Sequence, residues 1–264
     1  AISVGYGLLG VYVWRRKDAI GSGSLSAFAV LWGLAFVLTS AEVFIVASYG
    51  VTSGAQLAQL TVPSNVRLLL FVIAPATELF VVTAIYAWLW FVLNYTTRLN
   101  GRERFAIGGL MSLFILVTAL NSTIGTLTTF GYLPLTSGAL SGVHLFANIV
   151  EILGTGIAIG TGVAQLFRTS QRYALFDSGA VPALSASVLV LYLVRYLYRL
   201  GIVPAFDTIE LFRLGGHVIG LVGLWLAVSY YRVFDQLPAS QTVGRATALD
   251  NLETAIVVVN RRGA

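Results

Sequence analysis

Residues 67–95 read RLLLFVIAPATELFVVTAIYAWLWFVLNY, an apolar stretch in which Arg67 and Glu78 are the only charged residues. An α-helix rises about 1.5 Å per residue, so about 20 residues cross the roughly 30 Å hydrocarbon core of a bilayer. The polar–apolar alternation that a strand of a membrane β-barrel requires is absent. The stretch therefore predicts a transmembrane helix, and Pro75 predicts a kink within it because proline removes one backbone hydrogen bond.

The composition of the whole chain extends this prediction to the entire protein. Its residues are 57% hydrophobic and only 10% charged, whereas soluble domains carry about 25% charged residues. A single water-soluble core cannot hide so much apolar surface, so we expect an integral membrane protein. The sequence has no cysteine, which excludes disulfides and thiolate metal sites.

Six further apolar runs complete a predicted all-α bundle of seven transmembrane helices. They cover residues 2–14, 25–48, 104–130, 139–167, 180–201 and 208–233. The first run is too short to span a bilayer by itself, and the chain begins without Met, so we expect this first helix to be incomplete at its amino terminus. The glycines of GTGIAIGTG (154–162) provide the small-residue spacing that allows close contact between helices.

The distribution of basic residues predicts the orientation of the bundle. Alternate connections and the segment after the last run hold twelve of the sixteen basic residues, and the opposite connections hold almost none. Positive charge stays on the cytoplasmic side, which places the amino terminus outside and the carboxyl terminus in the cytoplasm. The twelve residues are Arg15, Arg16, Lys17, Arg98, Arg102, Arg104, Arg168, Arg172, Arg232, Arg245, Arg261 and Arg262.

Composition changes after the last run and divides the chain into three parts. Residues 1–233 form the predicted seven-helix membrane domain, and residues 234–252 are polar and then helix-compatible, typical of a cytoplasmic linker helix. Residues 253–264 contain TAIVVVN, rich in β-branched residues, followed by the turn-like NRRG. We expect this last part to be the truncated start of a further soluble domain.

Ionisable and amide residues inside the predicted spans gather in the outer half of the membrane or near its midplane. A charged side chain at the bilayer centre is costly and must face the bundle interior or a water-filled cavity. The inner halves of the spans are nearly free of charge. The candidate ligand-binding residues are Glu42, Glu78, His144, Asn148, Glu151, Tyr192, Arg195, Glu210, Arg213 and His217.

The spacing of these residues places several on common helix faces. Glu210, Arg213 and His217 are separated by three and four residues, and His144, Asn148 and Glu151 by four and three, so each set lies on one side of its helix. Together they predict a polar chamber at or just beneath the outer surface. In the structural alternative, ion pairs among the same residues only fasten the bundle.

The sequence carries no catalytic or cofactor motif. A phosphate-binding glycine loop, a Gly-x-Ser-x-Gly elbow and a His-Glu-x-x-His pair are all absent. Retinal needs a lysine Schiff base, but the only lysine is Lys17, in a predicted cytoplasmic loop. A zinc site formed by His144, His217 and Glu151 remains an alternative, but we expect no cofactor, no metal and no nucleic-acid partner.

Two stretches carry a family resemblance. WLWFVLNYTTRLNGRERF (88–105) is similar to the join between spans three and four in the seven-helix amino-terminal region of prokaryotic sensor histidine kinases, where an aromatic helix end precedes a short basic loop. LDNLETAIVVVNRRG (249–263) resembles the start of a PAS domain. The resemblance implies a plasma-membrane homodimer that passes a signal to cytoplasmic PAS and kinase domains and on to a response regulator. The phosphoacceptor histidine and ATP site would lie beyond Ala264.

The resulting expectation is a sensory input domain, not itself an enzyme. A small polar or anionic ligand would use Arg195 and Arg213, and Tyr231, Arg232 and Pro238 would relay the signal where the last span ends. The main alternative is a secondary transporter or ion pathway with Glu42, Glu78 and Glu151 as a proton relay. A structural anchor for cytoplasmic domains is the third possibility.

Overall fold

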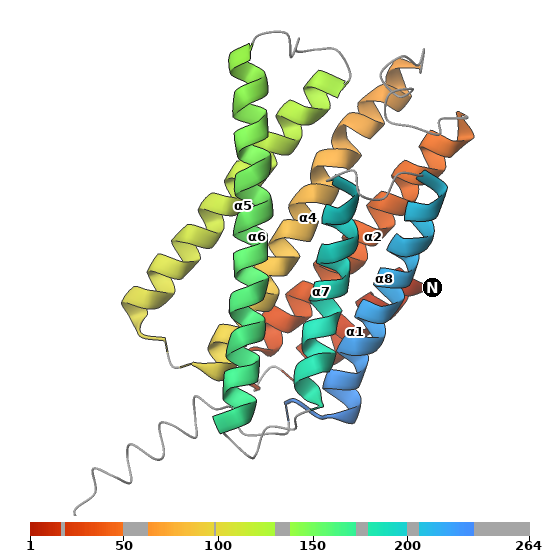
Figure 1. Ribbon diagram of the computed structural model, residues 1–264. Helices are drawn as coiled ribbons and strands as arrows, with labels where there is room; N and C mark the ends of the chain where they lie inside the picture. The colour runs from red at the N-terminus through yellow and green to blue at the C-terminus, as the bar shows by residue number, and fades with distance from the viewer. Residues whose placement is uncertain are drawn as a thin grey trace, which may run out of the picture.

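The structure, a computed structural model, describes residues 1–16, 19–49, 63–97, 99–129, 138–172, 179–199 and 206–234. For residues 129, 138–141, 194, 195, 198, 199 and 206–214 it describes the backbone only. Within these ranges the regular structure is entirely helical, and the long helices pack side by side in an elongated bundle (Figure 1). The helices are α1 (Ile2–Trp14), α2 (Ser22–Ser48), α4 (Ser64–Thr96), α5 (Gly101–Thr129), α6 (Gly138–Arg172), α7 (Ala180–Arg199) and α8 (Phe206–Trp225), the last continuing as a π-helix, η1 (Leu226–Tyr230).

Each predicted apolar run corresponds to one of these helices, with small differences at the ends. The helix α6 continues to Arg172, beyond the predicted end at residue 167, because its last turns are polar but remain helix-compatible. The helix α4 runs through Pro75 without a break. The linker 234–252 and the strand expected within 253–264 lie outside the described residues, apart from Phe234.

Within the described ranges, four helices are long and apolar enough to cross a bilayer. They are Ser22–Ser48, Ser64–Thr96, Gly101–Thr128 and Gly142–Arg172. Their exposed surface is also apolar, since Leu113, Leu116 and Leu120 on α5 are each more than half exposed. Soluble proteins rarely display such a stripe. The described part of the chain is therefore all-helical, and the protein is membrane-embedded.

Neighbouring helices contact one another in chain order, and α8 returns to contact α1. The helix α4 has the largest role in packing, because it contacts α2, α5 and α6. We call the end where α2 ends and α4 begins the upper end of the bundle, and the end where α6 ends and α7 begins the lower end (Figure 1).

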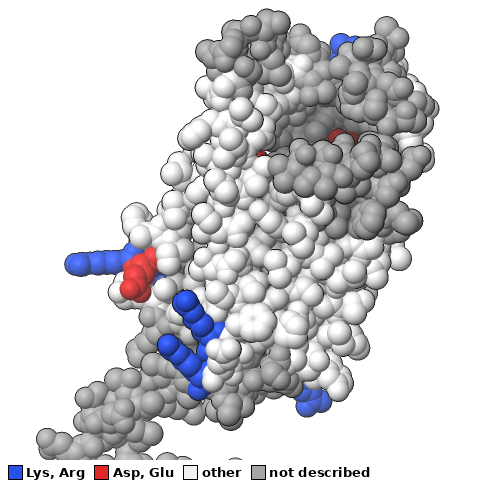
Figure 2. All heavy atoms as spheres, viewed as in Figure 1, with Lys and Arg blue, Asp and Glu red and all other residues white. Residues whose placement is uncertain are grey.

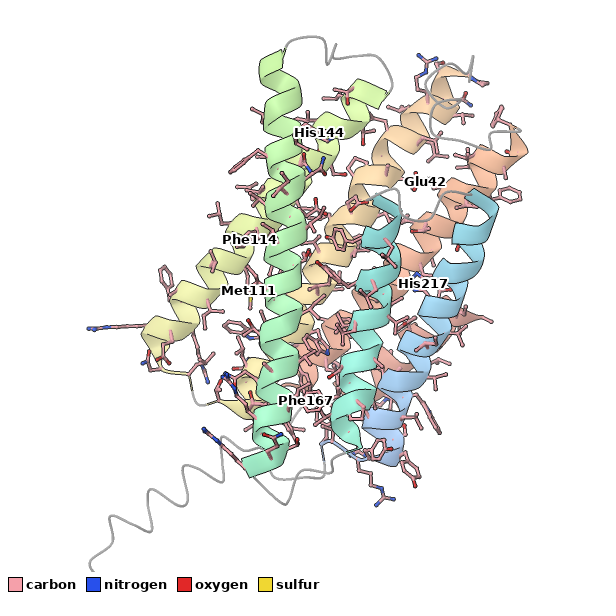
Figure 3. All side chains as sticks on the ribbon, in the orientation of Figure 1. Glu42, Met111, Phe114, His144, Phe167 and His217 are labelled. Atoms are coloured by element: carbon pink, nitrogen blue, oxygen red, sulfur yellow. The ribbon has the colours of Figure 1, made fainter. Side chains whose placement is uncertain are left out.

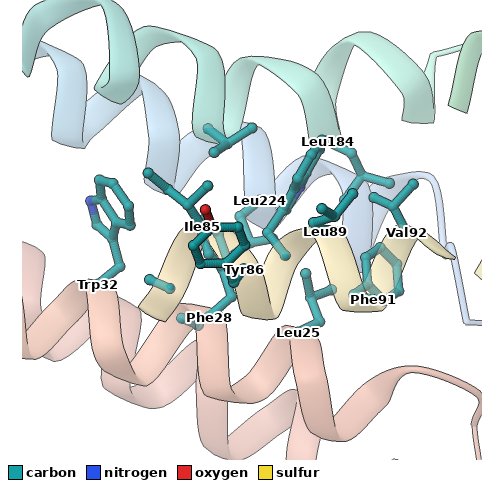
Figure 4. Close-up of a cluster of buried hydrophobic side chains, with 14 of the residues drawn as sticks. Leu25, Phe28, Trp32, Ile85, Tyr86, Leu89, Phe91, Val92, Leu184 and Leu224 are labelled. Carbon is teal, nitrogen blue, oxygen red and sulfur yellow. The ribbon is translucent and has the colours of Figure 1, made fainter. Parts of the chain in front are cut away.

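The apolar core lies in the lower half of the bundle, around the second half of α4. Ile85, Trp88 and Phe91 on this helix are completely buried, and α2, α7 and α8 contribute side chains such as Leu184 and Leu224 (Figure 4). This half is filled with tightly packed aromatic and branched side chains, and its buried polar residues are small ones such as Ser22, Thr96 and Ser187.

Small residues on α6 allow its neighbours to approach closely. A Cβ atom at Gly162 would lie 2.3 Å from the Trp88 ring, and one at Gly154 would lie 2.6 Å from the Phe114 ring. Gly156 faces the hydroxyl of Tyr192 in the same way. Gly160 has open space around it, so it does not share this packing role.

The contrast between two glycines of α6 gives a test of this packing. Gly162→Ala forces the Trp88 ring or the helix to move, and overpacking of this kind costs about 1–3 kcal/mol. Gly160→Ala meets nothing and should be neutral or slightly stabilising, since alanine favours the helix by up to about 1 kcal/mol. Thermal unfolding of both variants in detergent micelles measures the difference. Equal unfolding temperatures would contradict the close α4–α6 contact.

Candidate functional site

Among the described residues, the buried and half-buried Glu and His side chains lie in the upper half or near the middle of the bundle, and most exposed basic side chains lie toward the lower end. Glu42 and His144 lie in the upper half (Figure 3), and Lys and Arg atoms gather mainly toward the lower half (Figure 2). Acidic atoms are also visible near the upper end in Figure 2. Six exposed arginines lie near the helix ends of the lower half: Arg15, Arg102, Arg104, Arg168, Arg172 and Arg232.

One polar cluster joins α6 to α7. Glu151 is only 2% exposed, and its Oε1 accepts a hydrogen bond from the hydroxyl of Tyr196 at 3.3 Å. The hydroxyl of Thr155, one turn along α6, lies 3.0 Å from the same Tyr196 hydroxyl. The Tyr192 ring packs against that of Tyr196 with centroids 4.5 Å apart, and the Tyr192 hydroxyl donates to the carbonyl of Ile152 at 3.0 Å. The predicted Glu151 and Tyr192 therefore belong to one network.

Tyr86 of α4 lies next to this cluster. Its side chain interacts electrostatically with Glu151 and Tyr196, and its ring stacks on Phe114 of α5 with centroids 6.1 Å apart. Residues of α4 and α7 thus lie near Glu151 of α6, and Phe114 of α5 packs on the Tyr86 ring. The arrangement provides hydrogen-bond donors and acceptors around a carboxylate in an otherwise apolar bundle, which suits recognition of a small polar molecule.

A second cluster surrounds His217 at the contact of α8 with α1 and α2. The indole Nε1 of Trp32 donates to His217 Nδ1 at 3.1 Å, and the hydroxyl of Tyr6 donates to the His217 carbonyl at 3.1 Å. The Phe36 ring lies 4.6 Å from the imidazole, centroid to centroid. Since Nδ1 accepts, the imidazole is neutral with its proton on Nε2.

A third group of polar residues lies between α5 and α6. The side-chain amide of Asn121 donates to Asn148 Oδ1 at 3.0 Å. His144 sits against Gly125, where a Cβ atom would be 3.0 Å from its Cε1. His144 and Asn148 are half-buried, whereas Asn121 is only 3% exposed.

The described candidate residues thus fall into separate clusters. His217 lies against α1 and α2, away from the α5–α6 contact that holds His144, and among the described residues no group of His, Asp or Glu could hold a metal ion. Glu42 and Glu78 are half-buried on α2 and α4, which pack along each other. The side chains of Arg195, Glu210 and Arg213 lie outside the described residues.

Several cluster members were not among the predicted site residues. Trp32, Tyr6 and Asn121 are polar partners in the middle of apolar runs. The sequence did contain a signal for them, because a Trp or Tyr far from the membrane interface must bond its N–H or O–H inside the bundle.

The chain leaves the bundle through a structured junction at the end of η1. Arg232 has φ 48°, a left-handed conformation that costs a non-glycine residue about 1–2 kcal/mol. The next residue, Val233, is fully buried, and its carbonyl accepts a hydrogen bond from the hydroxyl of Tyr95 at 2.7 Å. Tyr231 packs so closely on Gly179 that a Cβ there would lie 2.3 Å from its ring. Of the predicted relay residues, Tyr231 and Arg232 lie in this junction, and Pro238 is outside the described residues.

No family model matches the chain, and neither a curated protein nor a solved structure matches it. We therefore infer its function from the residues and contacts described above.

The junction can be tested by removing a single hydroxyl group. Tyr95→Phe leaves the buried Val233 carbonyl without its donor, which costs about 1–3 kcal/mol. Tyr230→Phe is the matched control, because the Tyr230 side chain is 71% exposed and keeps its ring contact with Tyr231. Chemical denaturation in micelles should show a lower free energy of unfolding for the first variant only. The junction would be excluded if both variants unfolded like the parent.

Proposed function

We propose that this chain is the seven-helix membrane input region of a two-component sensory receptor, a histidine kinase. Its amino terminus would lie outside and its basic lower end in the cytoplasm. The observation that carries the proposal is the one-sided placement of buried ionisable residues, because Glu151 and His217 lie above a tightly packed lower core. A polar region closed on one side suits a receptor for a molecule that arrives from outside.

The helix α8 supports a route for the signal. It carries His217, held by Trp32 of α2 and Tyr6 of α1, and its continuation ends at the junction where Tyr95 holds Val233. A shift of α8 would therefore change both contacts together. A ligand changes this balance only through its different affinities for the two arrangements.

The ligand and partners follow from the expected chemistry and from the family resemblance. A small polar or anionic molecule would bridge Arg195, Arg213 and the Glu151 cluster. PAS and kinase domains would follow the linker, and the receptor would act as a homodimer in the plasma membrane with a response regulator as its partner.

A transporter would also need a polar pathway through the lower half of the bundle. A secondary transporter needs a polar site that can open to either side. In the described part of the lower half, the bundle interior is filled by residues such as Trp88, Phe91 and Leu184, all completely buried. This packing favours a receptor over a transporter.

The output part of the proposal is tested by the reading frame beyond the codon for Ala264. We expect it to encode a complete PAS fold, then a phosphoacceptor helix and an ATP-binding domain. A stop codon within a few residues would remove the kinase from the proposal and shift the choice toward a transporter.

The input part is tested on the full-length protein in proteoliposomes by measuring autophosphorylation. Glu151→Gln and Tyr196→Phe alter the cluster and should change the basal rate or the response to an outside extract. Ile157→Ala is the control, since Ile157 lies on α6 and is 68% exposed toward lipid. The chamber assignment fails if these variants, together with Arg195→Ala and Arg213→Ala, all respond like the parent. A parallel flux assay with the same vesicles distinguishes transport.

A further inference from the structure

The contact between α5 and α6 has a well-defined register. The helix α5 crosses α6 obliquely (Figure 1), and three contacts match residues on the two helices. Phe114 faces Gly154, Asn121 bonds to Asn148, and Gly125 faces His144. The two helices are antiparallel. The step from His144 down to Glu151 on α6 therefore matches the step from Gly125 down to Thr118 on α5, where the residue numbers decrease.

This register places a column of polar residues on the facing sides of two membrane helices. Thr118, at the level of Glu151, is only 1% exposed, and Glu151 is 2% exposed. Asn121 and Asn148 lie one turn above, and His144 lies another turn above. We call these five residues the polar seam.

Polar atoms along the seam lack partners among the described residues. Asn121 Oδ1 and His144 Nδ1 are buried atoms without a hydrogen bond, and so is the hydroxyl of Tyr86, which faces Glu151 from α4. Asn121 and Tyr86 are 3% and 5% exposed, so lipid headgroups do not reach them. A buried polar atom without a partner costs several kcal/mol on an apolar scale.

The simplest structural role of the seam does not account for these atoms. Polar residues between membrane helices commonly bond each other and hold the helices together. The Asn121–Asn148 bond does this, but it leaves Asn121 Oδ1 unused. The His144 and Tyr86 atoms also take no part in it. Three unsatisfied atoms on three helices call for hydrogen-bonding molecules from outside the protein.

We propose that the polar seam is a dead-end aqueous path that admits water and small hydrophilic molecules from the upper end down to Glu151 and Tyr86. Its floor is formed by the close contacts of Phe114 with Gly154 and of Trp88 with Gly162. The path goes beyond the proposed receptor function and does not depend on it, since accessibility is a property of the bundle alone.

The absence of cysteine from the chain allows a direct test by cysteine accessibility. Single variants Asn148→Cys and Thr118→Cys place a thiol in the upper and lower parts of the seam. Leu116→Cys is the control at similar depth on the lipid-facing side of α5, where Leu116 is 56% exposed. Ala158→Cys places a thiol on α6 within the floor, one turn below Gly154 and one turn above Gly162. The probe is a small cationic methanethiosulfonate reagent applied to the full chain in nanodiscs.

The seam thiols should be labelled at least about tenfold faster than the two controls, because only a thiolate in contact with water reacts. Labelling of Asn148→Cys but not of Thr118→Cys would overturn the path to Glu151, and labelling of neither would overturn the seam entirely. Fast labelling of Ala158→Cys would contradict the floor. Size-exclusion profiles identify a variant that fails to fold. The other seam position then still tests the path. Loss of the kinase response in the receptor assay would not change these rates.

Discussion

A polar group inside a bilayer finds no hydrogen-bond partner in the hydrocarbon, and this constraint governs the whole structure. It requires the backbone to form helices, since every N–H and C=O must be satisfied within the segment. It also turns the buried polar side chains inward. Glu151 bonds to Tyr196, His217 to Trp32, and Asn121 to Asn148, and each partner lies on another helix. The polar contacts therefore decide which helix faces are neighbours, while the leucines of α5 face outward.

The two halves of the bundle have different physical characters as a result. The lower half contains a tightly packed aromatic core around α4, in which glycines such as Gly162 allow rings to approach the helix backbone. The upper half combines partly buried carboxylates with the Asn and His side chains of the α5–α6 contact. The helix α8 connects both, because it carries His217 and ends in the junction at Val233. A tightly packed lower half and a polar upper half fit the proposed receptor, in which a signal enters at one end and leaves at the other.

Much of the helical arrangement could be predicted because run length and hydropathy report directly on the bilayer. All of the predicted runs match helices, and the structure places Glu151 and Tyr192 in one polar network. The partners of the polar residues were harder to predict. Spacing shows which residues share a helix face, but Trp32, Tyr6 and Asn121 were found only as partners across helices. Likewise, no local pattern predicted the π-helix or the left-handed Arg232 at the end of α8.

The sequence by itself determined that this is a helical membrane protein, where its helices lie along the chain, and which of their positions carry ionisable groups. These properties depend on local composition and on the cost of moving a side chain from water into hydrocarbon. Only the tertiary structure decided that His217 and Glu151 belong to separate clusters, and that Thr118 lies level with Glu151 across the α5–α6 contact. The reason is that helix register and crossing depend on how ring, glycine and amide surfaces fit between helices that are distant in sequence.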